Sequence, residues 1–548
     1  MMLPLSRQPS PRNTPSPMAR PVHSNPEPSS PSPRASIDSY TDSQHLLAHP
    51  AASNTLKLTP LNGLALVLGL QIGSGIFSAP STVSLHVASP AEGLGIWLIG
   101  GLLAWTGASS FVELGLAVPR NGGIQEYLQE CYGDFMAFLF TWTWVVIVKP
   151  CANAVIATVL ADYACSAVLP GKQEAAQVVT KAVGVLAVVA ISTLNCLGAR
   201  TGPQAANGFL VLKLGLVLSI VVLGLAFCVG RGDGIPKSKT GWLGSDPLED
   251  RVIWVRFGDL VTALFAALFC YGGWESIGFV VGDMKAPTKN LPRVLHSSMT
   301  ITICSFFGLV VALYLCLPMD NIRSHTTLAA DFGEKVLGQV GRRAYAFAIA
   351  ISTLGALNTN IFATAKLCES ASQRGYLPAV LANLHFEDEE DEMLYYDKIL
   401  RKWPLFLSYP IIKFAKSTAK LRITGHIPIY AIMLNAFMAI FYVVVGTFNG
   451  LVVFVGIAEY FFFFFCVLGV FVIRARRARN SEPHLYQTWT INPLIFITLS
   501  SLFVIRGLVA NPLQGVALCA VSLVGWIVFW IRFPSRHHHT SIRAEPPA

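Results

Sequence analysis

Twelve long apolar stretches follow one another along this chain, and each is close to the roughly 20 residues that an α-helix needs to cross a bilayer. Only 13% of the 548 residues are charged, whereas a soluble domain has about a quarter. The pattern predicts an all-α membrane protein with twelve transmembrane helices, and a count of eleven or thirteen also fits it. The predicted helices cover residues 61–88, 93–118, 134–163, 176–198, 205–230, 257–283, 297–318, 343–370, 427–446, 450–473, 489–510 and 512–532.

The basic residues indicate how the chain is oriented. If the N-terminus is cytoplasmic, most Lys- and Arg-bearing connections fall inside, and the short outer connections 447–449 and 511 carry no basic residue. This follows the positive-inside rule and predicts that both termini are cytoplasmic. A nucleic-acid-binding surface is excluded, because the net charge of +9 is spread over many short loops. The residues placed inside include Arg120, Arg200, Lys285, Lys289, Arg293, Arg474, Arg479, Arg532 and Arg536.

Three polar segments lie outside the apolar stretches. Residues 1–55 are rich in Ser and Pro and predict a disordered cytoplasmic tail, because they cannot bury enough apolar surface to fold. Residues 386–425 open acidic and close basic, and they predict a cytoplasmic insertion that is either a solvated loop or partly an amphipathic helix on the membrane. Residues 536–548 form the second predicted tail, so the transmembrane domain is predicted at 56–535.

Glycines interrupt the first apolar stretch at Gly73-Ser74-Gly75. Glycine leaves the helical conformation at low cost, and a broken helix at membrane depth persists only where it packs in protein or lines a cavity. Unwinding would free amides that bind a carboxylate at the start of a half-helix, beside carbonyls that accept from an ammonium. The pattern therefore predicts an α-amino acid site, with a small-residue packing surface as the alternative. The donors would be Ser74, Gly75 and Ile76, and the acceptors would lie near Gln71 and Ile72.

A second glycine pair, Gly272-Gly273, interrupts the stretch 257–283. Paired interruptions in two halves of a membrane chain are the sequence pointer to a transporter's central site. Carbonyls of Phe269 and Cys270 would complete the ammonium site, and the Phe269 ring would act as a lid. Either Tyr271 or Trp274 would border the side-chain pocket, unless these rings only pack between helices.

Ionisable and polar residues inside the stretches are further candidates. Lys213 lies about 12 Å along its predicted helix, which is deep for an ammonium. Lys149 faces a cavity or pairs with a carboxylate. Glu275 binds a cationic substrate, carries a proton, pairs with a lysine or has a structural role. Glu113 is expected to contact the loop at Asn121. A polar row on the eighth stretch is expected to border the cavity: Ser352, Thr353, Asn358, Thr359 and Asn360.

Several motifs in order along the chain resemble the L-type amino acid transporters of the amino acid–polyamine–organocation superfamily. The resemblance runs from about Gly63 to Phe529 and does not include the polar segments 1–55 and 386–425. It implies a LeuT-like fold, with a 5+5 inverted repeat at about 61–230 and 257–473 and two peripheral helices at about 489–532. It also implies amino acid substrates, often large and neutral, moved without sodium. The motifs are Gly73-Ser74-Gly75-Ile76-Phe77, Glu113-Leu114-Gly115, Asn121-Gly122-Gly123, Tyr271-Gly272-Gly273-Trp274 and Asn290-Leu291-Pro292.

The resemblance assigns two further expectations. Lys213 corresponds to a lysine in similar transporters, so its ammonium is expected to replace the sodium ion of sodium-coupled relatives and to support the first helix. Vertebrate relatives are joined to a glycoprotein through a cysteine in the outer loop after the third helix. Here Cys165 lies close to the helix end and no cysteine follows Pro170 in that loop, so no disulfide-linked heavy chain is expected. At Glu275 the sequence departs from vertebrate relatives, which tend to carry asparagine.

The sequence thus predicts a sodium-independent amino acid transporter of the plasma membrane that works by alternating access, by exchange or by proton-linked uptake. A carrier of cationic amino acids or polyamines and a non-transporting amino acid sensor are the alternatives. We expect no enzyme, because no nucleophile–base set is present. We also expect no cofactor and no metal site, because most of the eleven cysteines lie within apolar stretches and lack ligand spacing.

Overall fold

The computed structural model describes residues 58–168, 177–197, 201–230, 242, 252–378, 381, 428–481 and 486–533. The predicted tails 1–55 and 536–548 and the predicted insertion 386–425 lie outside these residues. In the described part, eleven helical segments are long and apolar enough to span a membrane, and the shorter apolar helix Ile429–Val445 adds a twelfth. The predicted all-α, twelve-helix architecture is therefore confirmed.

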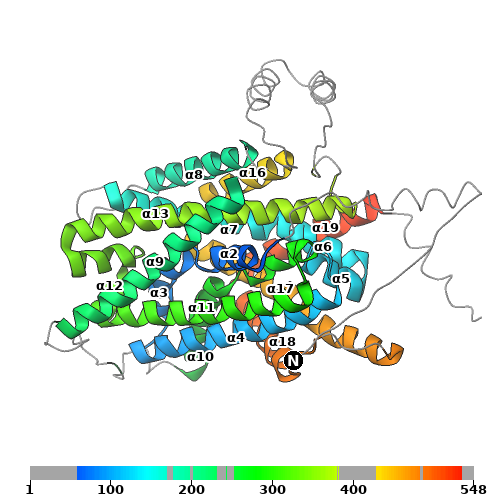
Figure 1. The fold of residues 1–548 in the computed structure, drawn as a ribbon, viewed down its shortest axis with the longest axis horizontal. Coiled ribbons are helices and arrows are strands. Elements are labelled where there is room, and N and C mark those ends of the chain that lie inside the picture. Colours follow the sequence, from blue (N-terminus) through cyan, green and yellow to red (C-terminus); the bar gives the residue numbers. More distant parts are fainter. Residues whose placement is uncertain are drawn as a thin grey trace, which may run out of the picture. The chain divides into compact units, whose positions relative to one another are not determined.

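The first half of the chain forms the first five spans (Figure 1). Its elements are α2 (Pro60–Gln71), α3 (Gly75–Leu85), α4 (Pro90–Ala117), α5 (Ile124–Tyr132), α6 (Asp134–Thr143), the π-helix η1 (Trp144–Val148), α7 (Lys149–Val168), α8 (Gln177–Leu197) and α9 (Thr201–Gly230).

The second half forms the remaining spans. Its elements are α10 (Ile253–Tyr271), the 3₁₀ helix η2 (Trp274–Asp283), α11 (Pro287–Cys316), α12 (Met319–Ser324), α13 (Leu328–Gln373), α16 (Ile429–Val445), α17 (Phe448–Asn480), α18 (Ile491–Ala510) and α19 (Pro512–Arg532). α13 consists of two helices joined at Gly338, whose φ of 71° is left-handed.

The first spanning helix is broken where the glycines predict it. α2 begins with Pro60 after the N-cap Thr59, whose hydroxyl accepts from the Asn62 amide, and it ends at Gln71. α3 starts again at Gly75 with Ser74 as its N-cap residue. The Ile72 amide donates the last helical hydrogen bond of α2, to the Leu68 carbonyl at 2.8 Å. The ladder stops there, so peptide groups on both sides of the break are available for other partners.

The sixth spanning helix is broken in the corresponding place of the second half. α10 ends at Tyr271, and η2 starts at Trp274. Gly273 between them has a φ of +102°, a conformation that residues with a side chain rarely adopt. A Cβ at Gly273 would come within 2.8 Å of the Leu70 Cβ, so the two breaks are packed directly against each other.

Long helices from both halves cover the breaks. α11 runs beside α4, and α13 packs along α7 (Figure 1). The Pro292 ring within α11 and the left-handed Gly338 within α13 mark the irregular places of these helices. The buried core that results is continuous from the first span to the last described one, and the two breaks lie inside it.

Glu113 near the C-terminal end of α4 does not make the predicted contact with the Asn121 loop. Both carboxylate oxygens accept from the Arg474 guanidinium of α17 at 2.8 and 2.7 Å, and the Thr488 amide donates to one of them. The Asn121 side chain instead accepts from the Gly282 amide at 2.7 Å. The prediction was wrong because a bidentate guanidinium satisfies a buried carboxylate better than a loop does, and Arg474 lies far away in the sequence.

Candidate functional site

A cavity lies at the point where the two helix breaks meet. Five elements line it: the α2–α3 break, the α10–η2 break, α7, α13 and α17. Its volume is about 80 Å³, which is room for several water molecules, since one water needs about 10–15 Å³. The lining residues are Leu70, Gln71, Gly73, Ser74, Gly75, Lys149, Ala152, Ile156, Phe269, Cys270, Gly272, Gly273, Glu275, Asn360 and Glu459.

The first break presents backbone donors to this cavity. Ser74 and Gly75 both line it, and the amides at the start of α3 have no partner within the helix. Gly75 leaves no space for a side chain, because a Cβ there would lie 2.9 Å from the Cys270 Sγ of the second break. Glycine at this position therefore lets the two breaks pack closely together beside the cavity.

Of the residues predicted to accept through their backbone carbonyls, some line the cavity and others do not. Gln71 lines the cavity, and its side chain joins the two breaks by donating to the Tyr271 carbonyl at 3.4 Å while accepting from the Thr302 hydroxyl at 3.0 Å. The side chains of Ile72 and Ile76 are fully buried in the core, so only their peptide groups are candidates. The Phe269 carbonyl already accepts from the Gly272 amide at 3.3 Å, and the half-buried Phe269 ring borders the cavity.

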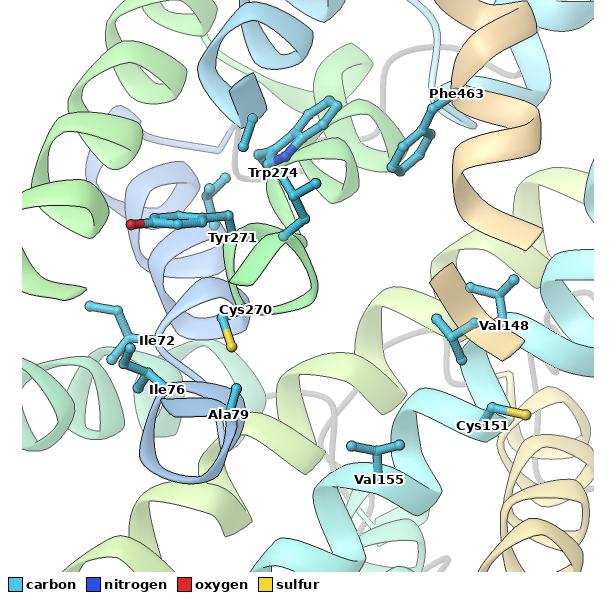
Figure 2. Close-up of a cluster of buried hydrophobic side chains, with 14 of the residues drawn as sticks. Ile72, Ile76, Ala79, Val148, Cys151, Val155, Cys270, Tyr271, Trp274 and Phe463 are labelled. Carbon is cyan, nitrogen blue, oxygen red and sulfur yellow. The ribbon is translucent and has the colours of Figure 1, made fainter. Parts of the chain in front are cut away.

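The rings of Tyr271 and Trp274 do not line the cavity and pack between helices, so their predicted role at a side-chain pocket is not supported. Trp274 stands edge-on to Phe111 at 4.7 Å between ring centroids. The ring centroid of Phe463 lies 5.3 Å from that of Trp274, and Figure 2 shows these two rings. The Tyr271 hydroxyl donates to the Trp97 carbonyl at 3.0 Å on the other side of the break. Large rings next to a break fill the space that the missing helical turns leave open.

Asn360, and not the predicted Asn358, is the amide side chain of α13 that faces the cavity. Asn358 accepts from the Asn195 amide nitrogen of α8 at 2.7 Å and lies on another face of the helix. Two positions along an α-helix are about 200° apart, so the polar row on this helix could not all face one cavity.

Lys213 of α9 is fully buried, and its ammonium donates to the Gly69 carbonyl of α2 at 2.6 Å. Gly69 lies within the last turn of α2, where carbonyls lack an amide four residues ahead in the helix. The resemblance places a lysine against the first helix, and the contact is present in the structure.

Lys149 and Glu275 face each other at the cavity wall. The Lys149 ammonium lies 3.6 Å from one Glu275 oxygen and donates to the Asn360 amide oxygen at 3.5 Å. The other Glu275 oxygen accepts from the Gly273 amide at 2.8 Å, and the Ser276 hydroxyl donates to the first at 3.1 Å. Of the options left open for Glu275, pairing with a lysine is therefore the one that the geometry shows.

A cavity residue that the sequence reasoning missed is Glu459 of α17, which is half-buried. It lies close enough to Lys149 and Glu275 to interact with both electrostatically. The signal that could have found it is its isolation, because it is the one carboxylate in the apolar stretch 450–473.

The fold and the cavity together define a class of protein. Two discontinuous helices, in corresponding places of two halves, meet at a cavity inside a bundle of spanning helices, and this is the arrangement of a membrane transporter with a central substrate site.

The comparisons give the family. The profile of the amino acid permease family matches residues 58–531. The b(0,+)-type amino acid transporter 1 of Mus musculus is 26% identical over 473 residues, which cover 86% of this chain and 87% of that protein. The large neutral amino acids transporter small subunit 2 of Mus musculus is 24% identical, with 86% and 80% covered. This chain belongs to the amino acid permease family, and it is a multi-pass membrane transporter of amino acids and not an enzyme.

Proposed function

We propose that this permease binds one α-amino acid between its two broken helices and carries it across the plasma membrane by alternating access. The single observation that carries the proposal is the cavity where Ser74 and Gly75 of the first break meet Phe269 and Cys270 of the second. A chamber bordered by the amides at a helix start and by the carbonyls at a helix end, at the depth of a membrane, suits a zwitterion.

The head group is bound by backbone alone in this proposal. The substrate carboxylate accepts from the amides at Ser74, Gly75 and Ile76, where the dipole of α3 adds a favourable potential. The ammonium donates to carbonyls near Gln71, Ile72 and Cys270. Backbone contacts do not distinguish one substrate side chain from another. The wall formed by Phe269 and Ile156 therefore sets the size of the side chain that fits.

Neutral substrates fit the cavity better than long cationic ones. The cavity volume of about 80 Å³ leaves little room for a long side chain that ends in an ammonium or guanidinium beside the head group. The name of the relative described above for large neutral amino acids is in line with this preference.

Sodium independence is attributed to Lys213. Its side-chain nitrogen lies 2.6 Å from the Gly69 carbonyl and donates to it beside the first break. A bound cation is therefore not needed to hold the helix end.

Three proposals concern the setting of the transporter. Both termini lie in the cytoplasm, and repeat one spans about 61–230 while repeat two spans about 257–473, followed by peripheral helices at about 489–532. The protein works without a disulfide-linked heavy chain, because Cys165 lies within α7 near its end and is partly covered.

The test is uptake into proteoliposomes made with the purified full chain. Labelled leucine or labelled lysine is added in a sodium salt or in a choline salt of the same concentration. Each measurement is made with and without unlabelled leucine inside the vesicles. We expect leucine uptake to be equal in both salts and to exceed lysine uptake. Binding of leucine to the purified protein without any entry into the vesicles would replace the proposal by a sensor function.

A further inference from the structure

Three charged side chains border the cavity, and one of them has no partner. Lys149 comes from α7, Glu275 from η2 and Glu459 from α17. Two carboxylates and one ammonium give this wall a net charge of −1 when all three are ionised. An unbalanced charge at membrane depth is costly, so such a wall calls for one more positive charge.

Glu275 is not the carboxylate in need of that charge. Its two oxygens accept from the Gly273 amide at 2.8 Å and the Ser276 hydroxyl at 3.1 Å, and the Lys149 ammonium lies 3.6 Å away. It also lies in the first turn of η2, where the amide groups favour an ionised carboxylate. Both Glu275 oxygens therefore have partners of their own, and Glu275 has a structural role at the second break.

Glu459 differs from Glu275 in its contacts and in its position along the helix. It makes no hydrogen bond or ion pair with the part of the chain that the structure describes, although it lies within electrostatic range of both Lys149 and Glu275. It lies in the middle of α17, far from a helix N-terminus that would favour its anion. It is half-buried and lines the cavity.

We propose that Glu459 is the proton-binding group of this transporter, and that it is protonated when an amino acid enters the cavity from outside. The proposal rests on the proposed function and adds a coupling ion to it. A proton from the outer solution adds to the Glu459 carboxylate to give a neutral carboxyl. After the cavity opens to the cytoplasm, the carboxyl releases that proton to water there and becomes the carboxylate again.

A proton fits this place better than the cationic end of a substrate. The cavity of about 80 Å³ has little room for a long side chain beside the head group, whereas a proton adds no volume. The other titratable groups near Glu459 are Glu275 from η2, the Cys270 thiol from α10 and Tyr460, which is adjacent in α17. Among the described residues, α13 contributes only the neutral Asn360 to the lining, and α4, α5, α18 and α19 contribute none.

The first experiment measures protons taken up on binding, which needs no transport. Leucine is titrated calorimetrically into the purified full chain at pH 7 in two buffers of different ionisation enthalpy. We expect uptake of close to one proton per leucine for the wild type and none for Glu459→Gln. The exposed Glu130 supplies the matched control Glu130→Gln, which should behave like the wild type.

The second experiment measures coupling in proteoliposomes. With one proton moved per substrate, an inward gradient of one pH unit sustains about tenfold accumulation of leucine. We expect wild-type vesicles to accumulate leucine in this way and their lumen to acidify with the substrate. Glu459→Gln should exchange external labelled leucine for internal leucine at a rate that does not change with pH, with no accumulation.

The outcomes separate the two proposals. Wild-type protein that exchanges leucine without taking up a proton or responding to the gradient would overturn the role of Glu459 and leave the transport function standing. Proton uptake that persists unchanged in Glu459→Gln would overturn it as well. Absence of both exchange and binding in the wild type would instead reject the proposed function. If Glu459→Gln does not bind leucine, the number of protons taken up on binding is measured for Glu459→Asp instead. We expect that number to be close to one if Glu459 is the proton-binding group.

Discussion

The two helix breaks carry almost the same sequence signature and differ in chemistry. The first break leaves the amides of Ser74 and Gly75 open at the cavity. The second break is closed on itself, because the Glu275 carboxylate accepts from the Gly273 amide and the Gly272 amide donates to the Phe269 carbonyl. A glycine pair therefore predicts where a helix stops, but the side chain that follows the pair decides whether the freed peptide groups remain available for a ligand.

Neighbouring side chains reinforce the difference. Small residues surround the first break, and bulky rings surround the second, where Trp274 packs on Phe111 and Phe463. The first break is thus suited to hold a substrate, and the second is suited to act as a preformed wall against which the substrate is held. Substitutions at each break test this division of roles.

The largest effect is expected from removing the carboxylate that closes the second break. Glu275→Ala removes the carboxylate that lies 3.6 Å from the Lys149 ammonium and accepts from the Gly273 amide, and breaking a buried ion pair from one side costs about 3–5 kcal/mol. We expect a much lower thermal unfolding midpoint in detergent. Glu275→Gln, which keeps an acceptor for the Gly273 amide, should lose less. Equal midpoints for Glu275→Ala and the wild type would show that the second break does not depend on its carboxylate.

The next effect concerns the helix end beside the first break. Lys213→Met removes the donor to the Gly69 carbonyl, and an unsatisfied buried acceptor costs about 1–3 kcal/mol. We expect leucine uptake to fall about 10- to 100-fold at equal surface expression, a factor that corresponds to this energy. The exposed Lys335 provides the control Lys335→Met, which should keep wild-type uptake. Unchanged uptake kinetics in Lys213→Met would reject its role at the break.

A smaller effect is expected where the two breaks touch. An added methyl in Gly75→Ala would lie 2.9 Å from the Cys270 Sγ, so the neighbour must shift and the amide site widens. We expect the KM for leucine to rise about tenfold, since overpacking costs about 1–3 kcal/mol. Cys270→Ala removes the sulfur, and the double variant should regain part of the affinity. A KM that stays high in the double variant would show that the sulfur contact is not the cause.

Much of the fold could be predicted from the sequence because single spans and single breaks are local properties. Twenty apolar residues define a span, and a glycine pair within it defines a break without reference to any other part of the chain. The contact of Lys213 with the first helix was available only through the resemblance, because it joins residues that are 144 positions apart.

The identity of the cavity side chains was predicted less well, for a geometric reason. Sequence reasoning gave the polar row of α13 but could not decide which side of the helix faced the cavity, so Asn358 was chosen where Asn360 lies. Glu459 was missed because the apolar stretch 450–473 was considered only as a membrane span, without regard to the carboxylate within it. Tyr271 and Trp274 were assigned to a pocket because they flank a break, although rings at such places are also needed to fill the core.

The smallest effect on transport is expected at the ring that sequence reasoning had placed beside the substrate. Trp274→Phe keeps an aromatic ring against Phe111 and Phe463 and should cost about 1 kcal/mol of stability. Because the Trp274 ring does not line the cavity, the KM for leucine should stay within about twofold of the wild type. Phe269→Ala is the contrasting variant, since its ring borders the cavity and its loss should raise the KM severalfold. Uptake kinetics of the two variants at equal surface expression compare the roles directly, and a larger KM change in Trp274→Phe than in Phe269→Ala would place the pocket on the opposite side of the second break.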